Sequence, residues 1–402
     1  MAVNVKVGLI GALDMLKFKN MAKVREQAIQ AAPAKEINGD FSINKLAKEL
    51  HPDYQILTIK EIIEHPGANA KTYVLGREDG KPVPYFRAGM YLSLKLQIKE
   101  SFVTRAYSIS SGPEDALNGT YSITIKANPG GFVADELLAN LKVGDKLTTS
   151  APEGFFYYEN LRDPKNVVAI AGGSGVTPFK SMAEAIEKGI EDFNLTLIYG
   201  CKTKDQILFK EEFDKLAQTC DKFKVVYVLD SEELEGYEHG FITCDIIKKY
   251  VPEGEFSIFA SGPEAMLLSL RKEIQGFNLP RRLVRFENLA PTKNVAAKEG
   301  YPKEAEGKTF NLKVKQGENV YEIKALANEP ILVAIERAGI KAPSRCRSGE
   351  CGWCRSKVVS GTFFIPDQDL RRFTDIEFNY IHPCCSFPTS DMEIEVPGEY
   401  LG

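Results

Sequence analysis

Five cysteines near the C-terminus of this 402-residue chain have the spacing that points most directly to a chemistry. Cys346, Cys351 and Cys354 form the pattern C-x4-C-x2-C, and the pair Cys384-Cys385 follows. This spacing, with a distant fourth thiolate, is that of a plant-type [2Fe–2S] site, so it predicts a one-electron carrier. A structural zinc site is the alternative, because it also uses four thiolates. Zinc sites usually pair two short C-x2-4-C segments, however, and this chain has one.

The fourth ligand must be chosen between two neighbouring cysteines. Plant-type ferredoxins, which this segment resembles, place their last ligand four residues before a proline, in Cys-x-x-aromatic-Pro. Cys384 stands at that distance from Pro388. The resemblance therefore selects Cys384 as the fourth ligand and leaves Cys385 as a spare thiol.

A short motif in the first half of the chain has side chains suited to a flavin. Arg105, Tyr107 and Ser108 supply a cation for phosphate, an aromatic face for the isoalloxazine ring and a polar group for the ring edge. Side chains alternate along a strand, so Arg105 and Tyr107 are expected on one face. The competing interpretation is that Tyr107 is simply a packed strand residue.

Three glycine-containing segments are suited to phosphate or dinucleotide. Glycines at the start of a helix let backbone amides approach an anion. One segment follows the apolar strand Val167–Ile170, and another ends a strand whose carboxyl end would face the same ligand. The residues concerned are Gly131, Val133 and Ala134, then Gly172, Gly173, Gly175, Thr177 and Pro178, and finally Ser261, Gly262 and Pro263.

These motifs, in this order, resemble the ferredoxin–NAD(P)+ reductase superfamily. The arrangement is similar to the reductase components that end in a plant-type ferredoxin, as in the phthalate dioxygenase reductase type. The resemblance implies that the Arg105 strand holds a flavin and that the glycine loop after residue 171 binds a nicotinamide dinucleotide, with Thr177 also near the flavin. It further implies electron flow from NADH to flavin, to the cluster and to an unidentified redox protein. No catalytic acid–base residue is expected.

Three departures from the family pattern qualify these expectations. Ala134 stands where a Ser or Thr usually reaches the flavin phosphate, so FMN remains an alternative to FAD. Ser261 replaces the cysteine of the Cys-Gly-Pro motif, so no thiol is expected near the nicotinamide. Glu287 is followed by Asn288 and Leu289 instead of a stacking aromatic residue, which predicts a softer lid over the flavin.

The coenzyme preference is encoded in the loop after the strand Leu195–Tyr199. Asp205 and the absence of arginine in this loop favour NADH. Lys202 and Lys204 could instead pair with the 2′-phosphate of NADPH, which stays the alternative.

Composition limits the remaining function classes. The net charge of −4 indicates no nucleic-acid or anionic-membrane partner. No run approaches 18 apolar residues, so no membrane span is predicted. Eight cysteines, four of them needed as ligands, suit a reducing cytoplasm better than a disulfide framework.

The secondary-structure pattern predicts a multi-domain chain that positions these motifs. Residues 1–51 form a helical extension, and 52–159 form an antiparallel β-barrel for the flavin, interrupted by one helix at Val133–Leu141. Strands and helices then alternate, which predicts a doubly wound α/β nucleotide domain with a parallel sheet over 160–288. A polar linker at 289–307 leads to a β-grasp ferredoxin domain at 308–402, where Phe310–Lys315 and Val320–Ala325 are strands and Pro330–Gly339 is a helix.

Charges around the cysteine loop suggest a basic docking rim. Arg345, Arg347 and Arg355 crowd the loop, and Glu350 is the opposing charge within it. We expect such a rim to attract an acidic partner. The alternative is that these arginines pair internally or contact the flavin domain.

The sequence therefore predicts an NADH-dependent iron–sulfur flavoprotein reductase. Two alternatives remain at this point: the same enzyme run in reverse, reducing NAD(P)+ with low-potential electrons, and a non-catalytic zinc-binding interaction protein.

Overall fold

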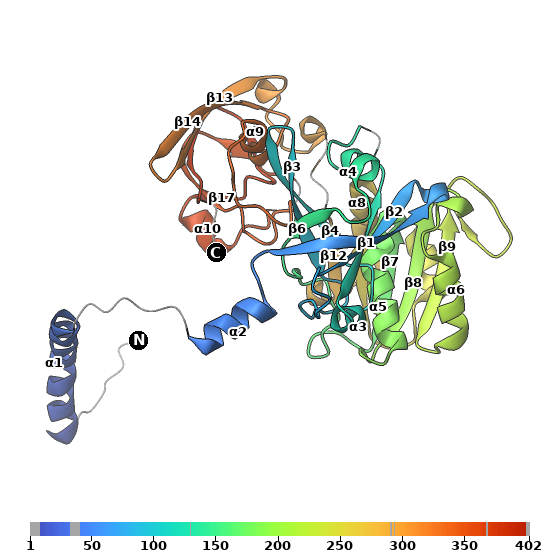
Figure 1. The fold of residues 1–402 in the computed structure, drawn as a ribbon, viewed down its shortest axis with the longest axis horizontal. Coiled ribbons are helices and arrows are strands. Elements are labelled where there is room, and N and C mark those ends of the chain that lie inside the picture. The colour runs from blue at the N-terminus through green and yellow to red at the C-terminus, as the bar shows by residue number, and fades with distance from the viewer. Residues whose placement is uncertain are drawn as a thin grey trace. The chain divides into compact units, whose positions relative to one another are not determined.

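The computed structural model describes residues 9–32, 41–128, 130–289, 292, 294–366 and 369–398 (Figure 1). The chain divides into two compact units, Met1–Lys48 and Glu49–Gly402. The helix α1 (Leu9–Ala31) lies in the first unit, and α2 (Ser42–Leu50) spans the boundary, so the described residues of the predicted extension are mostly helical. In the described part of the chain, no helix has the length and apolar character that crossing a membrane requires.

The second unit begins with an antiparallel sheet that curls into a barrel. Its strands run in the order β4-β3-β6-β1-β2-β5, and a bridge between Ile109 and Ile123 brings the two edges together. Buried Leu57, Tyr73 and Leu92 lie in its core. The strands are β1 (Gln55–His65), β2 (Ala70–Gly76), β3 (Tyr91–Ile98), β4 (Ser101–Ser108), β5 (Thr120–Lys126) and β6 (Lys146–Thr149).

The barrel carries two helices among its described residues, so the prediction of a single interrupting helix was wrong. α4 (Ala134–Asn140) is the predicted one. The other, α3 (Pro113–Leu117), is a short helix that starts at a proline in its first turn and buries Ala116. Five residues are too few to give a helical periodicity that can be read from sequence.

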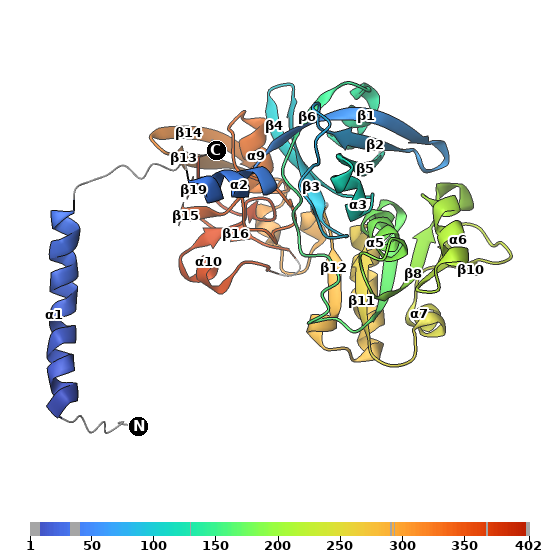
Figure 2. The same ribbon diagram turned by 60° about the horizontal axis from the view of Figure 1, so that its bottom comes forward.

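The next segment forms a parallel sheet in the order β10-β9-β8-β7-β11-β12. Helices α5 and α6 cover one face and α7 and α8 the other, because alternate residues of β7 pack with each pair (Figure 2). The strands are β7 (Asn166–Gly172), β8 (Asn194–Cys201), β9 (Phe223–Leu229), β10 (Glu238–His239), β11 (Phe256–Ser261) and β12 (Val284–Glu287). The helices are α5 (Thr177–Glu187), α6 (Lys210–Thr219), α7 (Cys244–Tyr250) and α8 (Glu264–Glu273).

The last segment forms a mixed sheet in the order β14-β13-β19-β15-β17, and α9 packs on it through Ile331, Ala334 and Ile335. This is the predicted β-grasp arrangement, in which β13 pairs antiparallel with β14 and parallel with β19. The elements are β13 (Thr309–Gln316), β14 (Asn319–Leu326), α9 (Ile331–Arg337), β15 (Ser356–Ser360), β16 (Phe363–Phe364), α10 (Phe373–Glu377), β17 (Tyr380–Ile381), β18 (Phe387–Pro388) and β19 (Met392–Glu395).

The segment predicted as a polar linker is packed over much of its length. Val295, Tyr301 and Ala305 are buried in one cluster with Ala327 and Phe387 of the ferredoxin-like sheet region. Two short 3-10 turns, Val295–Ala297 and Lys303–Ala305, each contribute one of these buried side chains, and Pro302 precedes the second turn.

Candidate functional site

The predicted cluster ligands divide into two pairs. Cys354 and Cys384 pack with Leu332 inside the ferredoxin-like domain. Cys346 and Cys351 instead face the barrel, where they pack with a cluster containing Tyr91 and Ala106. Cys346 and Cys351 of the loop thus face strands β3 and β4, whereas Cys354 of the loop and the distant Cys384 face the interior of their own domain. The thiol of Cys384 also interacts with that of Cys346, so the two pairs meet.

Backbone and hydroxyl groups in the loop are arranged to meet sulfur. The amide of Cys351 donates to Sγ of Cys346, and the amide of Trp353 donates to Sγ of Cys351, each at 3.4 Å. The hydroxyl of Ser348 is buried and has no hydrogen-bond partner among the described residues. Such donors stabilise an anionic iron–sulfur cluster, so the loop fits the predicted group.

The predicted ligands lie close to one another. The thiol of Cys384 interacts with those of Cys346 and Cys354, and the thiol of Cys346 interacts with that of Cys351. Four thiolates brought together in this way can be shared between the two irons of a [2Fe–2S] cluster.

A series of hydrogen-bonded polar side chains connects to the backbone of the cysteine loop. His382 shares a hydrogen bond of 2.6 Å between Nδ1 and the Gly349 carbonyl, and its Nε2 lies 3.3 Å from Oδ2 of Asp375. Arg355 donates to Oδ1 of the same carboxylate at 3.2 Å. Burial would raise the pKa of Asp375, but hydrogen bonds from Arg355 and His382 more than offset this and lower it. No local sequence pattern indicated this role for His382.

The predicted basic rim was wrong for two of its three arginines. Arg347 is 2% exposed and forms a bidentate ion pair with Glu336 of α9. Arg345 is 9% exposed and pairs with Glu153 of the barrel domain. The structure instead agrees with the competing interpretation: Arg347 pairs within its own domain, and Arg345 contacts the flavin domain.

Arg345 joins the cluster loop to the barrel through more than one contact. Its guanidinium carbon lies 3.7 Å from the ring centroid of Trp353 and 5.5 Å from that of Tyr54. A cation stacked on aromatic faces and paired with a half-buried carboxylate is strongly held. The loop is therefore fixed against the barrel beside Cys346.

The predicted flavin residues all lie on β4. Arg105 and Tyr107 are half-buried on one face, as expected, whereas Ser108 is buried on the other. Burial and the neighbouring cation of Arg347 lower the pKa of Arg105 to about 10, against the opposing effect of Glu336. Arg105 is thus a desolvated cation, which is what binding a phosphate in a low-dielectric site requires.

The glycine segment before α4 has features both for and against binding the flavin phosphate. A Cβ at Gly131 would lie 2.6 Å from the carbonyl oxygen of Asn128, so only glycine fits there. Val133 caps the helix without a side-chain hydrogen bond, and Ala134 begins it. Asp135 and Glu136 in the first turn oppose a phosphate at this end. The assignment of Gly131, Val133 and Ala134 to the flavin stays a prediction.

The glycine loop after β7 approaches the carboxyl end of β11 closely. A Cβ at Gly172 would lie 2.5 Å from Sδ of Met266, and one at Gly175 would collide with the carbonyl oxygen of Ser261. Thr177 donates from Oγ1 to the Ser174 carbonyl at 3.0 Å and begins α5, with Pro178 buried behind it. Ser261, Gly262 and Pro263 lie opposite, so the structure brings these two predicted segments together.

A buried glutamate at this junction was not predicted as a site residue. The hydroxyls of Ser108 and Ser261 donate to Oε2 of Glu287 at 3.1 and 3.5 Å. Burial, with a contribution from Glu350, raises the pKa of Glu287 to about 8. Glu287 is therefore a mostly protonated carboxyl between strands of the two domains.

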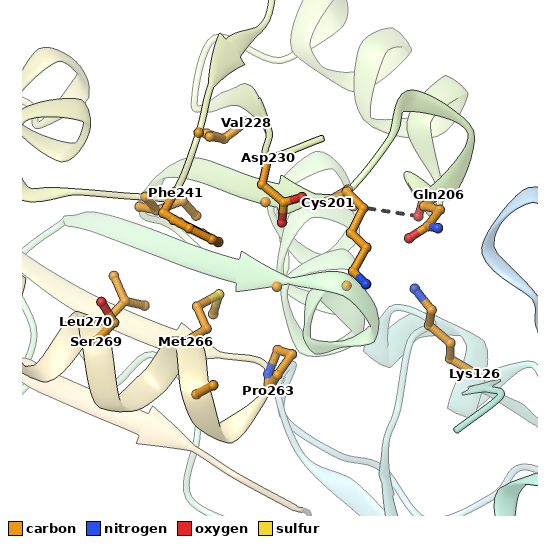
Figure 3. Close-up of a pocket in the computed structure, with 17 residues that line it drawn as sticks. Lys126, Cys201, Gln206, Val228, Asp230, Phe241, Pro263, Met266, Ser269 and Leu270 are labelled. Atoms are coloured by element: carbon orange, nitrogen blue, oxygen red, sulfur yellow. Dashed lines mark hydrogen bonds between the residues drawn. The ribbon is translucent and has the colours of Figure 1, made fainter. Parts of the chain in front are cut away.

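A pocket of about 430 Å³ opens at the carboxyl ends of β7, β8 and β9 (Figure 3). Gly172, Gly173 and Pro263 of the predicted residues line it. Its other lining residues include Lys126, which reaches in from β5, and Asp230, which follows β9. Residues lining the apolar end include Phe241, Ile242, Met266 and Leu270. The expected coenzyme determinant Lys202 also lines the pocket, but Lys204 and Asp205 do not.

Comparisons with known proteins agree with this order of sites. Residues 58–158 match the family described as oxidoreductase FAD-binding domain, 169–272 the oxidoreductase NAD-binding domain and 314–389 the 2Fe-2S iron-sulfur cluster binding domain. The glycine betaine monooxygenase reductase subunit of Pseudomonas aeruginosa is 26% identical over 77% of this chain and 87% of its own length.

Two further relatives define the extent of the likeness. NADH-cytochrome b5 reductase 1 of Eremothecium gossypii is 31% identical over 55% of this chain and 77% of that protein. The solved structure of phthalate dioxygenase reductase superposes with a TM-score of 0.62 at 23% identity, covering 86% of this chain and 98% of that one. These comparisons confirm the predicted fold of three domains and the family resemblance that the sequence motifs indicated.

Proposed function

Because this chain belongs to the ferredoxin–NAD(P)+ reductase superfamily and is an NAD(P)H-dependent iron–sulfur flavoprotein oxidoreductase, we propose that it delivers single electrons to an oxygenase component. The relative from P. aeruginosa, matched over most of its length, is by its name the reductase subunit of a monooxygenase. The structural observation that supports single-electron delivery is the packing of Cys346 against Tyr91 and Ala106, because it puts the cluster loop on the flavin strands. The choice of an oxygenase as the acceptor rests on the name of that relative.

When bound, the flavin accepts a hydride from the reduced nicotinamide, and the cluster carries the electrons onward one at a time. The chain's own residues hold these groups in sequence. Arg105 offers a desolvated cation to the flavin phosphate, and the glycine loop after β7 offers backbone amides to the pyrophosphate. Cys346, Cys351, Cys354 and Cys384 hold the cluster, and Arg345 keeps its loop on the barrel.

Glu287 supplies a place for a proton beside the reacting strands. With a pKa of about 8, its carboxyl is mostly protonated at neutral pH, and the hydroxyl of Ser108 is its neighbour on β4. A group that titrates near the working pH can both give and take a proton. Glu287 can therefore exchange a proton with the flavin side of the site through Ser108.

NADH is the proposed coenzyme. The carboxylate of Asp230 faces the pocket, where it can accept a hydrogen bond from a ribose 2′-hydroxyl and would repel a 2′-phosphate. Lys202 lines the same pocket and would attract a 2′-phosphate. The preference for NADH over NADPH therefore depends on the balance between Asp230 and Lys202.

An anaerobic titration tests the electron order. We expect a purified protein with flavin and [2Fe–2S] absorption bands, in which NADH bleaches both and yields the electron paramagnetic resonance signal of a reduced cluster. A flavin that is reduced by NADH while the cluster stays oxidised would contradict the proposal. A protein with neither band would contradict it too and would revive the zinc interpretation.

A further inference from the structure

Asp375 is a buried carboxylate that the proposed function leaves without a role. It lies in the short helix α10 and is 1% exposed. Its Oδ1 accepts a hydrogen bond from the Arg355 guanidinium at 3.2 Å, and its Oδ2 accepts one from the backbone amide of Arg372 at 3.4 Å. A carboxylate can be buried so deeply only where donors surround it. The remaining neighbour of its Oδ2 is His382, which leads away from the helix.

His382 connects Asp375 to the backbone of the cysteine loop. Its Nε2 lies 3.3 Å from Oδ2 of Asp375, and its Nδ1 lies 2.6 Å from the carbonyl oxygen of Gly349. A carbonyl oxygen can only accept a hydrogen bond, so Nδ1 carries a proton and donates it to this bond. The ring of His382 is 1% exposed, so bulk water cannot replace either contact. The direction of the Gly349 carbonyl is therefore fixed from α10.

The start of α10 holds a second carbonyl of the same loop. Nη2 of Arg372 donates to the carbonyl oxygen of Cys351 at 3.4 Å, while Asp375 holds the backbone amide of Arg372. In a trans peptide the carbonyl and the amide hydrogen point in opposite directions. Fixing the carbonyls of Gly349 and Cys351 thus also fixes the amides that follow them, in the stretch whose other amides donate to sulfur.

We propose that Asp375 is a positioning residue for the cluster: through His382 and Arg372, it holds the loop peptides in the orientation that lets backbone amides donate to the cysteine sulfurs. The inference rests on the proposed function, because it takes a [2Fe–2S] cluster as the occupant of the four cysteines. Hydrogen bonds to sulfur stabilise the more negative, reduced cluster, so a loosened loop should lower the reduction potential.

Two substitutions of His382 separate the roles of its ring nitrogens. In His382→Asn, the side-chain amide nitrogen can take the place of Nδ1 and still donate to the Gly349 carbonyl. In His382→Gln, the longer side chain puts its amide near the place of Nε2, so it reaches Asp375 and leaves Gly349 without its donor. We expect His382→Asn to keep a wild-type cluster. His382→Gln should lower the reduction potential and make loss of the cluster to an iron chelator about tenfold faster.

Asp375→Ala removes the partner of His382 and should have the same two effects as His382→Gln. Asp369→Asn is the matched control. Asp369 forms an ion pair with Arg371 just before α10 and, within the described part of the chain, has no hydrogen bond to the cysteine loop. This control should leave both quantities unchanged.

The potential is measured by spectroelectrochemical titration of the purified holoprotein, and retention of the cluster by its visible absorption after the chelator is added. Electron paramagnetic resonance of the reduced protein gives a third comparison, in which His382→Gln should differ from wild type and His382→Asn should not. Far-ultraviolet circular dichroism shows whether each variant is folded.

A difference between the two His382 variants supports the inference, since a merely structural role of the buried ring would change both alike. Equal behaviour of the two in all three measurements would overturn it while leaving the proposed function standing. A folded Asp375→Ala protein with a wild-type cluster would overturn it too, and if Asp375→Ala does not fold, the His382 pair decides alone. A wild-type protein that binds no cluster would overturn the proposed function as well.

Discussion

The raised pKa of Glu287 predicts how the stability of this protein depends on pH. Its pKa of about 8 in the folded protein lies above the ordinary value of 4.5, so the folded protein holds the proton more tightly than the unfolded chain. The free energy of unfolding must therefore fall as pH rises between these two values. At about 1.4 kcal/mol per unit, this one group lowers the stability by about 2 kcal/mol between pH 6 and pH 8.

Glu287→Gln removes the titration and keeps the shape of the side chain. We expect the stability of the variant relative to wild type to increase by about 2 kcal/mol on going from pH 6 to pH 8, because only the wild type must bury a charge. Urea denaturation of the holoprotein, followed by circular dichroism at the two pH values, measures this difference.

Glu255→Gln is the matched control, since Glu255 is an exposed carboxylate in the same part of the chain. Its stability relative to wild type should change little with pH. The reasoning about Glu287 is refuted if its variant and the control respond alike.

Three other outcomes are expected. Cys384→Ser should lose the visible absorption of the cluster while Cys385→Ser keeps it; the reverse result would move the fourth ligand by one residue. Arg345→Met should slow reduction of the cluster by the flavin at least tenfold in stopped flow, because it removes the ion pair between the cluster loop and Glu153 of the barrel, while reduction of the flavin by NADH stays unchanged. Unaltered cluster reduction would show that this contact does not hold the loop. Asp230→Asn should raise kcat/KM for NADPH relative to NADH about tenfold in steady-state assays, and an unchanged ratio would remove Asp230 from coenzyme selection.

Most of the features that could be predicted from the sequence depend on local patterns of residues. The spacing of Cys346, Cys351 and Cys354 is a property of one loop, and the strand containing Arg105 and Tyr107 shows the expected alternation. The glycines after β7 were recognisable because a close approach to β11 leaves no space for a side chain at Gly172 or Gly175. Such features depend on neighbours within a few residues, or on the one residue type that fits.

The missed features depend on contacts between distant segments. Arg347 looked like a surface charge, but its burial depends on Glu336, which lies on another element. Asp230 reaches the pocket at the carboxyl ends of β7, β8 and β9 only because β9 lies beside β8 in the sheet, whereas Asp205, closer to the glycine loop in sequence, does not line the pocket. Glu287 acquires its raised pKa from burial between two domains, and no local pattern encodes that.

The packed segment before the ferredoxin-like domain limits how far that domain can travel. Leu289 packs with Tyr91 and Ala106 on the barrel side, and Val295 is buried with Ala327 on the other. Six residue steps separate these two anchors, so even a fully extended chain spans only about 20 Å between them. Even if the contacts of Arg345 were broken, this short connection would therefore restrict the movement of the ferredoxin-like domain. The domain could not carry the cluster to a remote acceptor. The electron acceptor must instead dock at the cluster domain of the reductase, one acceptor at a time.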